Sequence, residues 1–162
     1  WPAGLKTSPG SYTSQPAHLI DFMATFLDVG KATYPKQVDT RAIDPLQGLS
    51  LNPIFRGEQR KPHDTLYFHF GTDRALRQGD WKLVSAKRGR WELYNMDADR
   101  TELHDLSATH SDRVKAMSAV WFDMAKNIDR VKGKQLAPVK EELSDIRFRK
   151  DTSDQLAPQD SK

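Results

Sequence analysis

The chain has 162 residues, of which 37% are hydrophobic and 29% charged, and its formal net charge at pH 7 is +3. This length suffices for one ordinary domain or for part of a larger one. No apolar run approaches the roughly 18 residues of a membrane-spanning helix, so no membrane span is expected in these residues. Cysteine is absent, which excludes disulfides, cysteine-ligated metal sites and a cysteine nucleophile within them.

The distribution of charge argues against a nucleic-acid partner. Positive and negative side chains alternate along most of the sequence, and no block of five like charges occurs. Such alternation is typical of a mixed, solvated surface rather than of a basic footprint for phosphates. We therefore expect no binding to nucleic acid.

A first helix is predicted after Pro16, which suits a first helical turn, and before Gly30, which suits the position just past a helix end. Its apolar residues recur at spacings of three and four: Leu19, Ile20, Met23, Phe26, Leu27 and Val29. This stripe is broad enough to be buried against a sheet, and Met23 is expected in the core. Residues 51–55 are predicted to form a short helical turn that Gly57 ends.

Residues 66–94 are expected to form an antiparallel meander. Residues 66–70 are rich in aromatic side chains, and residues 81–84 and 91–94 alternate in polarity. Turns that contain glycine, at 78–80 and 87–90, join these segments. Since residues two apart share a face of a strand, one face is expected to carry Trp81, Leu83, Trp91 and Leu93.

A second helix is predicted at about 111–128, with Ser111 as its cap. Its apolar stripe consists of Val114, Met117, Val120, Trp121, Met124 and Ile128. The predicted fold class is α+β, with a four-stranded antiparallel sheet and a packed terminal helix. The predicted segments are 1–57, the edge of a larger layer; 58–131, the sheet subdomain; and 132–162, a polar tail that is extended or disordered.

The sequence offers few groups for catalysis. No P-loop and no G-x-S-x-G elbow occurs. His63, Asp64, His69 and Asp73 could be imagined as a metal cluster, but polar loop and strand residues are the favoured interpretation. The acidic residues at 97–105 lack the glycine and the final glutamate of a calcium loop.

One basic cluster leaves two interpretations open: His69, Arg74, Arg77 and Lys82. Arginine can bind the oxygens of an anion through its planar fork, and lysine adds a point charge, so the cluster could recognise an anionic or polyhydroxyl ligand. Alternatively, the arginine and lysine stems cover aromatic residues on an ordinary strand face. Spacing alone favours the second interpretation.

Several motifs resemble those of formylglycine-dependent, arylsulfatase-like sulfatases of the alkaline phosphatase superfamily. R-A-L-R-Q-G-D-W-K-L-V at 74–84 and W-E-L-Y-N at 91–95 resemble the R-A-x-R-x-G-D-W-K-L-V and W-E-L-Y-D-L of that family's C-terminal subdomain. Upstream, W-P-A-G at 1–4, H-L-I-D at 18–21 and G-L-S-L-N-P-I-F-R-G at 48–57 resemble further family motifs in the same order. Two departures, Ala24 in place of proline and Gln47 in place of an acidic residue, are structural.

The resemblance implies that residues 1–57 end a truncated, alkaline-phosphatase-like α/β domain and that the sequence continues upstream of Trp1. In this family the nucleophile is a formylglycine made in a C/S-x-P-x-R motif, and a calcium ion polarises the sulfate. That motif is absent here, so we expect no catalytic residue, no metal ligand and no cofactor in this chain. The resemblance assigns substrate contact to His69 first and to Arg74 second.

The function expected by resemblance is the C-terminal part of a sulfatase that is inactive alone and contributes a pocket wall and substrate recognition. Its partners are then the missing N-terminal domain and a sulfated carbohydrate or aryl sulfate, in the periplasm or outside the cell. Residues 17–29 should expose apolar surface when isolated, because the sheet they cover is absent. Two alternatives remain: a stand-alone module that binds sulfated polysaccharide, and the tail of a related phosphoesterase.

Overall fold

The computed structural model describes residues 2–129, and the chain divides into two compact units between Asp64 and Thr65. The predicted boundary after residue 57 falls a little before this division. The predicted end of the subdomain at 131 and the predicted tail at 132–162 lie outside the described residues. Within residues 2–129, no helix has both the length and the apolar character needed to cross a membrane.

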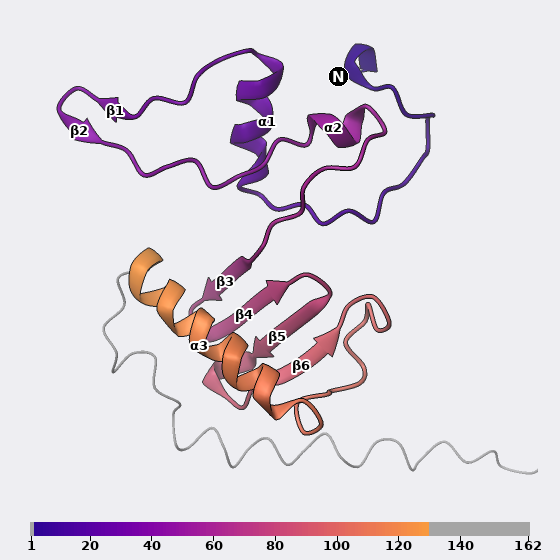
Figure 1. Cartoon of the computed structure of the whole chain (residues 1–162), viewed down its shortest axis with the longest axis vertical. Helices are drawn as coiled ribbons and strands as arrows, with labels where there is room; N and C mark the ends of the chain where they lie inside the picture. Colours follow the sequence, from indigo (N-terminus) through magenta and orange to yellow (C-terminus); the bar gives the residue numbers. More distant parts are fainter. Residues whose placement is uncertain (1, 130–162) are drawn as a thin grey trace, which may run out of the picture. The chain divides into compact units, whose positions relative to one another are not determined.

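The first unit contains one helix of more than two turns and several short elements (Figure 1). In chain order they are η1 (Pro2–Gly4), α1 (Asp21–Val29), β1 (Gln37–Val38), β2 (Arg41–Ala42) and α2 (Asn52–Phe55). β1 and β2 pair as an antiparallel hairpin. The short helical turn predicted at 51–55 is present as α2.

Helix α1 ends at Val29 with Gly30 just past its end, as predicted, but begins at Asp21 rather than directly after Pro16. The preceding residues form a turn, in which the Asp21 N–H donates to the His18 carbonyl at 2.9 Å. The Asp21 side chain accepts a hydrogen bond from the His18 N–H, also at 2.9 Å. This local bond between side chain and backbone competes with a helical conformation for residues 18–20, which explains the later start.

The apolar stripe of α1 lies in solvent. The buried side chains of the helix are Asp21, Ala24 and Thr25, whereas Phe26 is 70% and Met23 53% exposed. The same surface includes Leu19, Ile20, Phe22 and Val29. The prediction of exposed apolar surface at 17–29 is therefore confirmed, and the expectation that Met23 lies in a core is wrong for this chain.

The second unit has the predicted α+β fold. Its four-stranded antiparallel sheet has the order β3-β4-β5-β6, and α3 lies across one face (Figure 1). The elements are β3 (Leu66–Phe70), β4 (Asp73–Gln78), β5 (Trp81–Ser85), η2 (Ala86–Arg88), β6 (Glu92–Asn95) and α3 (Ser111–Ile128). The N-cap of α3 is His110 rather than Ser111, and no side chain caps the helix there.

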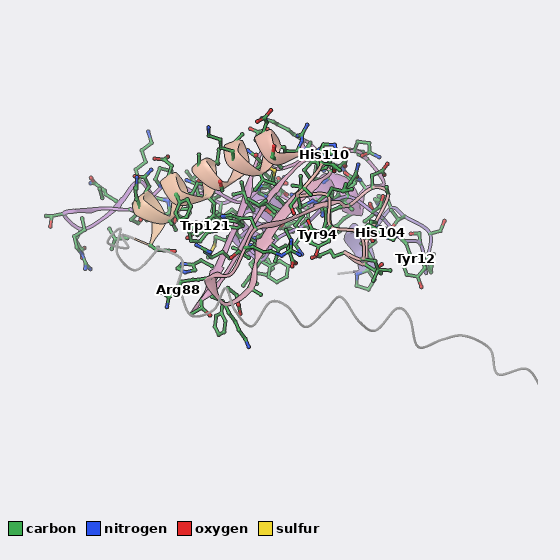
Figure 2. The ribbon with its side chains drawn as sticks, turned by 90° about the horizontal axis from the view of Figure 1, so that it is seen from below. Tyr12, Arg88, Tyr94, His104, His110 and Trp121 are labelled. Atoms are coloured by element: carbon green, nitrogen blue, oxygen red, sulfur yellow. The ribbon has the colours of Figure 1, made fainter. Side chains whose placement is uncertain are left out.

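The core lies between α3 and the sheet. Leu76, Leu83 and Leu93 follow one another across three strands in register, and none is exposed. Trp121 points from α3 toward the sheet (Figure 2) and donates from its indole nitrogen to the Phe68 carbonyl at 3.1 Å. The shared face predicted for two tryptophans and two leucines is confirmed, because Trp81 and Trp91 pack against this core. Each such buried leucine contributes about 1.5–3 kcal/mol.

The turns of the meander differ in backbone strain. Gly79 has φ +57° in the predicted turn between β4 and β5. Between β5 and β6, Lys87 and Arg88 adopt φ of 49° and 56°, and the Gly89 N–H donates to the Ala86 carbonyl at 2.8 Å. A side chain in this left-handed region costs about 1–2 kcal/mol, so this turn stores strain that a glycine would not.

Candidate functional site

His69, the first predicted substrate contact, lies on β3 and faces α3. Its register partner on β4 is Arg74, and the next pair on the same face of the sheet is Tyr67 with Leu76. Leu76 belongs to the core beneath α3. Since residues two apart share a face, Tyr67 and His69 both lie on the face of the sheet that the helix covers.

The polar partner of His69 is a carboxylate at the end of the helix. His69 Nδ1 lies 2.5 Å from Asp129 Oδ2, and the Tyr67 hydroxyl donates to the same oxygen. Asp129 follows the last residue of α3, and its N–H donates to the Ala125 carbonyl at 3.1 Å. Two donors from β3 thus converge on one carboxylate oxygen.

Aromatic side chains fix the orientation of the histidine ring. The His69 and Trp121 rings are 5.2 Å apart and meet edge to face at 87°. The Tyr67 ring lies 5.4 Å from Trp121. The His69 side chain is 20% exposed and that of Asp129 26%, so the pair sits at the border of the core. Such a ring cannot rotate freely, but solvent reaches it.

The electrostatics of the group keep Tyr67 neutral. Burial, followed by the hydrogen bond and the charge of Asp129, raises the pKa of Tyr67 well above its ordinary range. Its hydroxyl therefore acts as a donor to Asp129 at physiological pH. The C-terminus of a helix carries partial negative charge and favours cations, so a carboxylate there gains from donors such as these.

Arg74, the second predicted contact, is a core residue with 3% of its surface exposed. Its guanidinium lies 4.7 Å from the ring centre of Trp91 and 5.4 Å from that of Trp121, and Nη2 donates to Ser85 Oγ at 2.7 Å. Stacking of this kind contributes about 2 kcal/mol when it is desolvated. These contacts favour the interpretation in which an arginine packs against aromatic residues.

The sheet separates the predicted basic cluster instead of assembling it. Arg77 pairs with Lys82 in register, and both alternate with core leucines, so they lie on the face away from α3. Lys82 pairs with Glu102 at 2.5 Å, and Arg77 Nε donates to the Gly79 carbonyl at 3.1 Å. His69 and Arg74 lie on the opposite face, and the four residues form no common site.

The imagined metal cluster is also not formed. Across residues 2–129, no group of three or more His, Cys, Asp or Glu side chains could hold a metal ion. His63 instead bonds through Nε2 to Asp21 Oδ1 at 2.6 Å, and Arg60 Nη2 bonds to Asp21 Oδ2 at 2.9 Å. Burial raises the pKa of Asp21, but hydrogen bonds from Leu49, His18, Arg60 and His63 outweigh it and lower the pKa to about 2.

Sequence reasoning missed Asp129, although a signal was present. Met117, Trp121 and Ala125 are the buried residues of α3 and follow one another four apart. Asp129 is the next position in this row. Residues four apart lie on one face of a helix, so a carboxylate that continues a buried row indicates a polar partner on the sheet.

The comparisons with known proteins concern the fold. No protein-family model matches the chain, and no curated protein matches it. Ps i-CgsB matches at 22% sequence identity and a TM-score of 0.53 over 69% of this chain and 25% of its own. Ps i-CgsB in complex with k-i-k-neocarrahexaose matches at 20% identity and a TM-score of 0.55 over 80% of this chain and 28% of its own.

A weaker likeness is to BT4656 in complex with its substrate D-glucosamine-2-N,6-O-disulfate. Its TM-score is 0.46 at 24% identity, over 65% of this chain and 23% of that chain. The stronger likenesses show that the chain has the fold of part of Ps i-CgsB. The chain spans about a quarter of the length of the structures that it matches.

Proposed function

We propose that this chain is the C-terminal portion of a formylglycine-dependent sulfatase. In the whole enzyme it closes one wall of the substrate pocket and contributes His69 to the recognition of a sulfated carbohydrate or aryl sulfate. The upstream domain supplies the nucleophile and the calcium site, so the chain alone hydrolyses no sulfate ester. The enzyme is periplasmic or exported.

The observation that carries the proposal is the exposed apolar face of α1. Phe26 is 70% exposed, and Leu19, Phe22 and Met23 are exposed beside it. Proteins rarely expose apolar patches of this kind unless a partner covers them. An upstream α/β domain of the same protein is the partner that the ordered motifs at 1–4, 18–21 and 48–57 imply.

The fold supports the same proposal. A chain that aligns with 25% and 28% of two structures of Ps i-CgsB matches a portion of a larger protein. One of these structures contains k-i-k-neocarrahexaose, which agrees with a carbohydrate as the substrate class. The order of the chain's motifs, rather than sequence identity, supports its placement at the C-terminal end of a sulfatase.

Within this portion, His69 is the residue best placed to contact substrate. Its ring is partly exposed and held on one side by Asp129 and Trp121. Arg74 is buried among aromatic rings, which supports a structural role. The proposal of direct recognition therefore rests on His69.

The described part of the chain contains no group of side chains that could hold the calcium ion of the family. The role of these residues is to bind and orient the organic part of the substrate. Such positioning contributes to rate only when the reacting groups are held by the upstream domain.

A stand-alone polysaccharide-binding module is less well supported. That alternative uses six basic residues to bind a polyanion: Arg74, Arg77, Lys82, Lys87, Arg88 and Arg90. Several of them are already engaged within the fold. Arg74 is buried, Lys82 pairs with Glu102, and Arg90 pairs with Asp105 at 3.0 Å. A polyanion would have to compete with these internal carboxylates, which weakens its binding.

The decisive experiment determines the sequence that the gene encodes upstream of Trp1. Sequencing the gene should reveal an in-frame C/S-x-P-x-R motif, which a phosphoesterase tail would lack. The protein that contains both parts should then release sulfate from a sulfated sugar, and H69Q should lower kcat/KM by at least about 10-fold, the effect of one lost hydrogen bond. H104Q is the matched control, because His104 is exposed. A start codon close to Trp1, or equal activity of the two variants, would overturn the proposal.

A further inference from the structure

We infer that Asp129 is a positioning residue that fixes the tautomer of His69 and thereby makes Nε2 the atom offered to a sulfated sugar. The inference rests on the proposed function for the identity of the ligand. The positioning itself depends only on contacts within the second unit. These contacts are the bonds from His69 Nδ1 and from the Tyr67 hydroxyl to one oxygen of Asp129.

The first step concerns the proton on Nδ1. An ionised carboxylate only accepts hydrogen bonds, so the 2.5 Å contact between His69 Nδ1 and Asp129 Oδ2 requires a proton on Nδ1. The neutral ring then carries no proton on Nε2. A hydrogen bond at one ring nitrogen sets the state of the other in this way.

The second step concerns the ligand. Among the described residues, His69 Nε2 has no hydrogen-bond partner, and it is not one of the buried unpaired atoms. Unprotonated Nε2 accepts a hydrogen bond from a sugar hydroxyl, and protonated Nε2 donates one to a sulfate oxygen. A sulfated carbohydrate presents both groups, so it fits either protonation state of this histidine.

The third step concerns rigidity. The edge-to-face contact of the His69 ring with Trp121 favours the ring orientation that directs Nδ1 to Asp129. The titratable and charged groups that face the ring are Tyr67 on β3, Arg74 on β4 and Asp129 at the end of α3. Of these, Asp129 bonds to the ring itself.

The alternative is that Asp129 only fastens the end of α3 to β3. A structural clasp uses the same hydrogen bond and therefore holds the same tautomer. The two roles separate in sulfate release, because only positioning makes the effect of the Asp129 substitution disappear once His69 has been replaced. In a freely exposed neutral histidine the Nε2–H form predominates. A predominance of the Nδ1–H form therefore shows that the bond to Asp129 holds in solution, which positioning requires, and the double variant distinguishes positioning from a clasp.

The experiment measures this tautomer in the whole 162-residue chain labelled with ¹⁵N-histidine, by long-range ¹H–¹⁵N correlation at a pH where the ring is neutral. We expect the Nδ1–H form in the unmodified chain and a shift toward Nε2–H in D129A. D123A is the matched control, because Asp123 lies on the same helix and bonds only to Asn127 among the described residues. Thermal melts identify any variant that has unfolded, and D129L, whose side chain cannot accept a hydrogen bond, then replaces D129A.

The outcomes separate the two proposals. If His69 shows mainly the Nε2–H form, or if Asp129 substitution leaves its tautomer unchanged, positioning is refuted whatever the enzyme does. If the tautomer behaves as expected, sulfate release by the longer protein is measured with H69Q, D129A and both. Equal losses of about 10-fold in all three support action through His69, and additive losses overturn it. Unchanged sulfate release in all three would refute the proposed function and leave the tautomer result standing.

Discussion

Replacing Phe26 by alanine should destabilise the longer protein far more than it destabilises this chain. Full burial makes Phe→Ala cost about 3–5 kcal/mol. Phe26 is 70% exposed in the chain, so less than a third of that loss applies, about 1 kcal/mol. If an upstream domain covers the face of α1 in the longer protein, F26A should destabilise that protein by the full cost of about 3–5 kcal/mol.

Urea unfolding provides the assay, carried out on the chain alone and on the protein extended upstream. The expected difference in ΔΔG between the two is about 2–4 kcal/mol. L83A is the control: Leu83 is completely buried in the second unit, so its loss of about 2–5 kcal/mol should be the same in both proteins. An equally small effect of F26A in both would show that nothing upstream covers α1 and would refute the reasoning behind the proposed function.

Three further predictions concern single side chains. D21N should destabilise the chain by about 3–5 kcal/mol because it removes the carboxylate that neutralises the buried Arg60, which among the described residues keeps only its bonds to the Leu49 and Pro16 carbonyls. In the unmodified chain the stability that the ionised Asp21 contributes should be present above pH 4 and be lost toward pH 2, since its pKa is lowered from 3.8 to about 2; an unfolding midpoint that stays flat over that range would contradict this. R74M should lower the free energy of unfolding by about 2–4 kcal/mol, because the stacking on Trp91 and the hydrogen bond to Ser85 are lost. An unchanged melting temperature together with weaker substrate binding would instead indicate that Arg74 contacts the substrate. K87G should raise stability by about 1 kcal/mol because Lys87 has φ 49°, with A86G, at a position without positive φ, expected to bring no gain.

The second unit could be predicted from its sequence because local signals agree there. The alternation in 81–84 and 91–94, the glycine turn at 78–80 and the helical stripe at 111–128 all specify the same layer packing. The registers follow from the turn lengths, since the short turn at Gly79 places Leu76 opposite Leu83. Even so, the prediction of Ser111 as the N-cap of α3 was wrong, because the structure has His110 there. The capping position depends on side-chain geometry, which the residue type alone does not determine.

The first unit was harder to predict from sequence, because the apolar face of α1 is exposed in the described chain. The stripe in α1 predicts burial from pattern alone, yet the buried side chains are Asp21, Ala24 and Thr25 on the other side. Asp21 binds the backbone of residues 18 and 49 together with Arg60 and His63. Polar contacts over such distances along the sequence have no local signature, so the Asp21 cluster could not be predicted.

The basic cluster illustrates a different failure, which the sequence could have prevented. Arg74 and Arg77 are three apart, so on one strand they must lie on opposite faces. Once 73–78 is taken as a strand, Arg77 cannot share a site with Arg74, and Lys82 pairs with Arg77 across the turn. His69, the proposed substrate contact, lies on the face toward α3 and bonds to Asp129 at the end of that helix. The polar partner of a candidate site is therefore best sought where a charged residue continues the buried row of a helix, as Asp129 does after Trp121 and Ala125.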